Sequence, residues 1–79
     1  MNQESNEPLT FESLRKLAGY SQAKLGKQIG VSQSAVKLWE SGKCEPSISN
    51  VIALAKVLKV SIKTICSAMG IDVAEVPND

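Results

Sequence analysis

The sequence predicts an all-α fold, a compact domain of five short helices, on three observations. Apolar residues recur at helical spacing through the middle of the chain, and no alternating run of strand length competes with them. A serine or threonine precedes each of five apolar segments, as expected of helix N-caps. A glycine closes four of the five segments, where a left-handed residue satisfies the last carbonyl groups of a helix.

The first three helices follow directly from these signals. The first is expected after the cap Thr10 and should end before Gly19. The second runs from Ser21 to Ile29 and the third from Ser32 to about Ser41, with a turn at Gly30 between them. Because the connection is so short, the second and third helices can pack only at a steep angle, which is the geometry of a helix-turn-helix.

The helix-turn-helix needs a small residue where its two helices approach and an apolar set between them. Gly26 supplies the small residue, and Gly30 supplies a position where the backbone can take a positive φ. The side chains expected in the shared core are Leu25, Ile29, Val31, Val36 and Trp39.

The fourth helix follows Pro46 with Ser47 as its cap, and the fifth follows the cap Ser61 and ends at Gly70. The fourth has a broad apolar face made by Ile48, Val51, Ile52, Leu54, Ala55 and Leu58. On the fifth, apolar side chains recur at i, i+3 and i+7, at Ile62, Ile65 and Met69. This spacing indicates either core or an exposed face for a partner, and the sequence does not separate the two.

Composition restricts the class of protein. The 79 residues allow one small domain, expected at 10–70 between flexible acidic segments at 1–9 and 71–79. No apolar run approaches the roughly 20 residues of a membrane span, and the N-terminus does not resemble a signal peptide, so a cytoplasmic protein without a membrane partner is expected. Cys44 and Cys66 fit no metal spacing and the chain has no histidine, so neither a metal nor a cofactor is expected.

The net charge of +1 hides an uneven distribution of charged residues. From residue 13 to residue 63 the chain carries all nine of its lysines and arginines, and its only acidic residues there are Glu40 and Glu45. The remaining acidic residues lie towards the two ends. A basic middle between acidic ends can mark a domain that binds an anionic partner, and a solvated lysine-rich surface would give the same distribution.

The outer face of the third helix has the chemistry to read DNA. It would present Gln33, Ser34, Lys37 and Leu38 to the outside. Amide, hydroxyl and ammonium groups near a helix N-terminus match the donors and acceptors on base edges in the major groove of double-stranded DNA. Gln22, at the start of the second helix, adds a second feature suited to an anion.

The run "SQAKLGKQIGVSQSAVKLWESGKCEPS" closely resembles the helix-turn-helix of the phage repressor and Cro family, the XRE type. The likeness continues through "LAKVLKVS" and reaches upstream to Arg15, covering roughly residues 10 to 69. The resemblance implies a five-helix, lambda-repressor-like domain that binds palindromic operators as a transcriptional regulator.

The same resemblance implies roles for particular residues. Those at base-facing positions are Gln33, Ser34, Lys37 and Leu38, and those at phosphate-facing positions are Gln22, Ser41 and Lys43. Arg15 and Glu40 match a pair that forms an internal salt bridge between the first and third helices. Gly26 departs from the family pattern because alanine is usual there. Leu38 cannot form hydrogen bonds, so it would read only a thymine methyl group or pack on a sugar.

A single recognition helix covers too few base pairs to select an operator in a genome, so a homodimer on two half-sites is expected. The fifth helix is the predicted interface, through Ile62, Ile65 and Met69, and the dimer is expected to be weak in the absence of DNA.

The leading interpretation is a sequence-specific DNA-binding regulator, a repressor, and two alternatives stay open. An antitoxin would bind DNA by the same helix and a protein toxin through the apolar tail "GIDVAEV". A helix-turn-helix interaction module would bind proteins and no DNA. An enzyme is not expected, because the sequence shows no nucleophile paired with a base, no phosphate-cradling glycine loop and no metal cluster.

Overall fold

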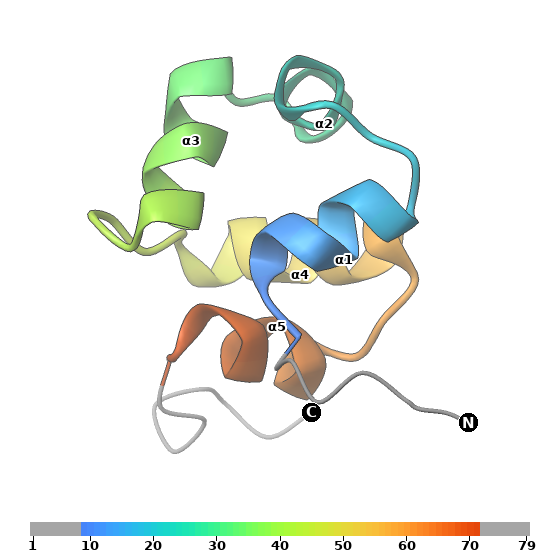
Figure 1. The fold of residues 1–79 in the computed structure, drawn as a ribbon, viewed down its shortest axis with the longest axis vertical. Coiled ribbons are helices and arrows are strands. Elements are labelled where there is room, and N and C mark those ends of the chain that lie inside the picture. Colours follow the sequence, from blue (N-terminus) through green and yellow to red (C-terminus); the bar gives the residue numbers. More distant parts are fainter. Residues whose placement is uncertain (1–8, 72–79) are drawn as a thin grey trace.

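Five helices follow one another between residues 9 and 71, the part of the chain that the computed structural model describes (Figure 1). They are α1 (Phe11–Leu17), α2 (Gln22–Ile29), α3 (Gln33–Ser41), α4 (Ile48–Leu58) and α5 (Ile62–Met69). No strand occurs in this part, and the all-α prediction is confirmed. The acidic segments predicted at 1–9 and 71–79 lie outside the described residues, apart from Leu9 and Ile71.

Each helix begins at its predicted cap. The cap hydroxyls accept the backbone N–H three residues later, and the cap residues are Thr10, Ser21, Ser32, Ser47 and Ser61. The four predicted closing glycines all have positive φ, between 74° and 86°. The fourth helix ends instead on Lys59, a non-glycine residue with φ 61°, and no stop signal in the sequence indicates this position.

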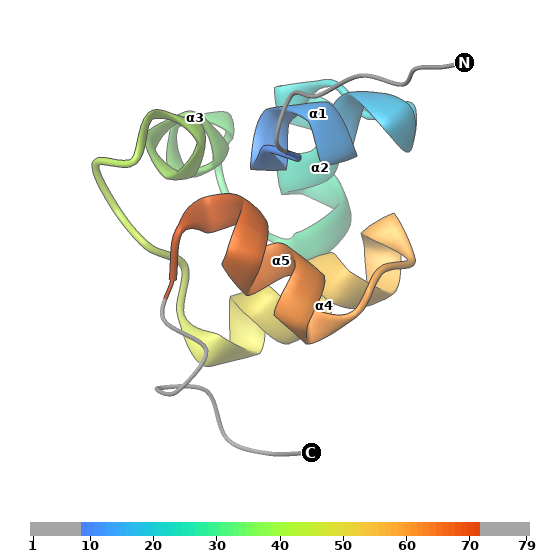
Figure 2. The ribbon, with the colours of Figure 1, turned by 60° about the horizontal axis from the view of Figure 1, so that its bottom comes forward.

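The two helices of the helix-turn-helix, α2 and α3, lie together at one end of the molecule. In Figure 1, α2 and α3 lie at the upper end of the molecule and α5 at the lower end, with α1 and α4 between them. α2 packs against both α3 and α4, while α1 contacts α3 and α5. Figure 2 shows α5 lying against α4. The helix-turn-helix therefore occupies one end of the domain, and the other three helices support it.

The core lies where the five helices meet. Its fully buried side chains are Leu25, Val36, Val51, Leu54, Ile65 and Cys66. Trp39 is also buried, and its ring centroid lies 6.4 Å from that of Phe11 on α1. The broad apolar face predicted for α4 is partly wrong, because Ile48 and Ile52 are 43% and 38% exposed. Only four of its six predicted members turn inwards, since α5 and α2 cover a limited arc of the α4 surface.

Gly26 lies in the middle of α2, on the side that packs against the turn leading to α3. A Cβ atom added there would lie 2.7 Å from the carbonyl oxygen of Val31 and 3.1 Å from that of Ser32. The neighbouring atoms belong to the backbone, and the Val31 N–H also donates to the Gly26 carbonyl at 2.8 Å. The turn can close this tightly because position 26 has no side chain.

Gly26→Ala is therefore expected to lower the free energy of unfolding. Alanine would gain about 1 kcal/mol of helix propensity, but overpacking against a backbone that must move costs about 1 to 3 kcal/mol. Chemical denaturation measures the difference. The matched control is Ala23→Gly at an exposed position of the same helix, which measures helix propensity alone. An increase in stability of Gly26→Ala would show that the turn relaxes freely.

Candidate nucleic-acid interface

The outer face of α3 carries the four residues predicted to read bases. Gln33, Ser34, Lys37 and Leu38 are all exposed, and they lie opposite Val36 and Trp39, which are buried. One turn of helix separates each early residue from a later one, so the four side chains share one face. We call this set the α3 outer face.

The α3 outer face is chemically available to a ligand. Within residues 9–71, the side chains of Gln33, Ser34 and Lys37 form no hydrogen bond or ion pair. The amide can donate and accept at once, the hydroxyl can do either, and the ammonium donates only. Leu38, 39% exposed, adds an apolar contact. This mixture suits the major groove, where each base pair presents donors, acceptors and, for thymine, a methyl group.

The turn after α3 is built around one carbonyl group. The oxygen of Leu38 accepts the Lys43 N–H at 3.1 Å, and it also accepts the hydroxyl of Ser41 at 3.0 Å. A hydroxyl has a single donor, so Ser41 in this conformation has no proton left for a phosphate. Ser41 is predicted to contact a phosphate. In the structure its side chain bonds the carbonyl oxygen of Leu38 at the end of α3. Lys43 is exposed and forms no ion pair with any described residue.

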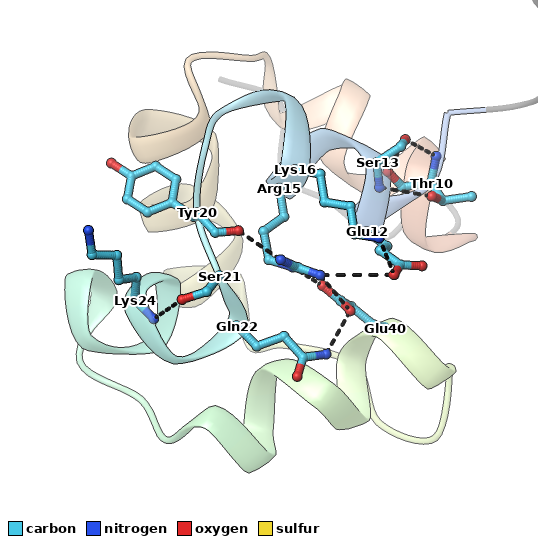
Figure 3. A network of polar contacts seen from close by, with 10 residues as sticks. All are labelled: Thr10, Glu12, Ser13, Arg15, Lys16, Tyr20, Ser21, Gln22, Lys24 and Glu40. Atoms are coloured by element: carbon cyan, nitrogen blue, oxygen red, sulfur yellow. Dashed lines mark hydrogen bonds and ion pairs between the residues drawn. The ribbon is translucent and has the colours of Figure 1, made fainter.

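A buried ion pair joins α1 to α3 in the position that the sequence predicts. The Nε of Arg15 lies 2.5 Å from Oε2 of Glu40, and the two side chains are only 8% and 9% exposed. Arg15 also donates from Nη1 to the Tyr20 carbonyl oxygen at 2.7 Å. These contacts tie α1, the loop before α2 and α3 together (Figure 3).

Gln22 also contacts this ion pair, and nothing in the sequence predicts that contact. It is half-buried at the first position of α2, and its Nε2 donates to Oε1 of Glu40 at 2.9 Å. The predicted phosphate-facing residue thus also contacts a protein carboxylate (Figure 3). No sequence signal would have found the contact, because residues 22 and 40 meet only through the crossing angle of α2 and α3.

The predicted interface on α5 needs one correction. Ile65 is fully buried in the core of its own chain, so it offers no surface to a second copy. Ile62 and Met69 are half-buried and pack against the edge of the core. The i, i+3, i+7 spacing thus combines one core residue with two residues that remain partly accessible.

Within residues 9–71 no group of three or more His, Cys, Asp or Glu side chains could hold a metal ion. None of the helices in this range has the length and apolar character of a membrane span. Cys44 is exposed, whereas Cys66 is buried in the core, where desolvation raises the pKa of its thiol. A raised pKa keeps a thiol protonated and unreactive, and Cys66 packs as an apolar core residue.

The amino-acid sequence is similar to that of known helix-turn-helix proteins. A helix-turn-helix family model matches residues 11–65, well over half of the chain. The chain is 45% identical over 47 residues to repressor protein C2 of Salmonella phage P22, covering 60% of this chain and 22% of that protein. It is 33% identical over 58 residues to the cryptic phage CTXphi transcriptional repressor RstR of Vibrio cholerae, covering 73% of this chain and 52% of that protein.

The alignments span about a fifth and about half of the length of these two curated relatives. No solved structure matches the chain. The family model covers α1 to α4 entirely and ends within α5, so it includes both helices of the motif and the residues of the α3 outer face. The chain belongs to the helix-turn-helix family, in its phage repressor and Cro (XRE) type.

Proposed function

We propose that this protein binds double-stranded DNA through the α3 outer face and acts in the cytoplasm as a transcriptional repressor. The observation that carries the proposal is the division of α3 into a buried face, with Val36 and Trp39, and an exposed face of unpaired polar side chains. Two relatives named as phage repressors support it. The alternatives of an antitoxin and of an interaction module without DNA binding have no observation in their favour in the described part of the chain.

The roles within the interface are divided by chemistry. Gln33 can form two hydrogen bonds to one base edge, so it is the best candidate for sequence reading, and Lys37 reaches from the next turn of the same face. Lys43, in the turn after α3, carries a positive charge with no protein partner in residues 9–71 and would contact a phosphate.

Gln33→Ala is expected to lose about 1 to 3 kcal/mol of discrimination between operator and other sequences, because alanine cannot pair with a base edge. Lys43→Ala should instead weaken binding to all sequences and reduce the slope of log K against log salt by about one unit. Selection from random duplexes and salt titrations measure the two effects.

Lys56→Ala is the matched control, since it removes the same charge from an exposed position on α4, outside the helix-turn-helix. Equal recovery of every duplex by wild type and Gln33→Ala would reject the base-reading role. A wild-type protein with no affinity for any duplex would reject the proposed function itself.

We further propose that two copies bind a palindromic operator as a two-fold dimer through α5. This surface has partly accessible Ile62 and Met69. The contact area is modest, so the dimer should form mainly on DNA, where adjacent half-sites bring the copies together.

A further inference from the structure

The side of α4 that faces away from the core has an apolar half and a basic half. Ile48 and Ile52 are 43% and 38% exposed, and further along the chain Lys56 and Lys59 are exposed as well. These positions recur at i, i+4, i+8 and i+11, so their side chains form one stripe along the helix and its C-cap. We call this set the α4 stripe. Neither lysine forms an ion pair within residues 9–71.

A hollow of about 280 Å³ adjoins the apolar half of the α4 stripe. Its lining includes Ile48 and Val51 from α4, Cys66 from α5 and Ile71, which follows the end of α5. Because Ile48 belongs to both, the hollow and the two isoleucines form one continuous, largely apolar surface. Burying such a surface stabilises a contact by about 25 cal/mol per Å² of apolar area removed from water.

The chain leaves α5 at this hollow. The Ile71 N–H donates to the Cys66 carbonyl oxygen at 2.8 Å, and the half-buried Ile71 side chain packs against the core. Figures 1 and 2 both show the end of α5 on the side where the chain enters α4. Residues 72–79, which lie outside the described part, therefore continue from a fixed point beside Ile48.

The 72–79 segment has the composition that this surface would bind. It reads "DVAEVPND", with apolar side chains at Val73 and Val76 and acidic ones at Asp72, Glu75 and Asp79. Its valines are suited to the isoleucines of the α4 stripe, and its carboxylates carry the charge opposite to that of the lysines.

The order of the two halves of the stripe also fits the segment. The hollow lies at the isoleucine end, so a segment that starts at Ile71 meets apolar side chains before it meets lysines. The isoleucine end and Lys56 are separated by about 12 Å along the helix, and an extended chain covers that distance in about four residues. Glu75 can therefore reach Lys56. Glu45 also lines the hollow and would repel a carboxylate there, which favours the lysine end for the acidic side chains.

We propose that the 72–79 segment docks along the α4 stripe of its own chain, with its valines against the isoleucines and the hollow and its acidic side chains beside the lysines. Attachment at Ile71 makes the contact intramolecular, and so short a tether corresponds to an effective concentration in the millimolar range. The contact is weak, because the segment loses conformational freedom and the ion pairs are exposed to water. A docked segment withholds the exposed isoleucines from other proteins. The contact is made by α4 and not by α3, so the inference is independent of DNA binding.

The direct test is solution NMR at low salt on the full chain, with isotope-labelled methyl groups. Nuclear Overhauser effects are expected between the methyl groups of Val73 or Val76 and those of Ile48 or Ile52. A sample that mixes labelled with unlabelled chains separates contacts within one chain from contacts between copies. These effects within one chain would support the proposal, and their absence, or effects between copies alone, would overturn it.

A double-mutant cycle in stability gives an independent measurement. Val76→Ala is expected to raise the equilibrium constant of unfolding about two- to fivefold in wild type, the contribution of one partly buried side chain. In the Ile52→Ala background its effect should fall below about 1.5-fold, because part of the docking surface is lost. Leu17→Ala is the matched control, since Leu17 is 79% exposed on α1 and Val76→Ala should keep its full effect in that background. No effect of Val76→Ala in wild type, or equal effects in all three backgrounds, would contradict docking on the α4 stripe.

Discussion

Arg15→Ala and Glu40→Ala are each expected to lower the free energy of unfolding by about 3 to 5 kcal/mol, because each leaves a charge buried without its partner. Both side chains are less than a tenth exposed, so water screens the pair little. Arg15→Ala should be the more severe change, since it also removes the donor to the Tyr20 carbonyl oxygen. Urea denaturation of the two variants measures both losses.

The two substitutions should also couple. Once Arg15 is gone, removing Glu40 relieves an unpaired buried charge, so the double variant should be more stable than the sum of the single losses predicts. Lys16→Ala is the matched control on the same helix. Its ion pair with Glu12 spans 3.1 Å, but the side chains are 64% and 54% exposed, and such pairs contribute about 0.5 kcal/mol or less. Strictly additive losses for Arg15 and Glu40 would show that the pair has no net interaction.

Local signals in the sequence predicted most of the fold because helix ends are local structures. The hydroxyl of a cap such as Ser32 bonds an N–H three residues away, and a glycine such as Gly30 provides a left-handed residue without help from distant parts of the chain. Lys59 shows the limit of this reasoning. It takes a left-handed conformation at the end of α4, where its N–H donates to the Ala55 carbonyl oxygen, and no glycine marks the position.

The candidate site was predictable only as far as periodicity reaches. Spacing along α3 places Gln33 and Lys37 outside and Val36 inside, and the structure agrees. Spacing along α5 cannot tell whether Ile65 faces its own core or a partner, because that depends on how α5 crosses α4 and α1. The contact of Gln22 with Glu40 joins positions 18 apart, so it depends on the angle between α2 and α3.

Ile62→Lys is expected to abolish cooperative binding to a full palindromic operator while leaving weak binding to a single half-site. A lysine at the α5 contact would place two like charges across the two-fold axis, where the interface is small and easily disrupted. Two linked half-sites can exceed the affinity of one by about 10²- to 10⁴-fold, so the loss on a full operator should approach that range. Titrations on duplexes carrying one or two half-sites, centred about 34 Å apart, measure it.

Ile52→Lys is the matched control, because Ile52 is 38% exposed on α4 and receives the same substitution away from α5. It should keep wild-type cooperativity if the contact is made by α5. Ile65→Lys is unsuitable as a test, since a charge at a fully buried position would unfold the chain before it could report on a dimer. If Ile62→Lys stays folded by circular dichroism and still binds the full operator with wild-type cooperativity, the two copies meet through another surface. Loss of cooperativity in Ile52→Lys alone would move the interface to the exposed isoleucines of α4.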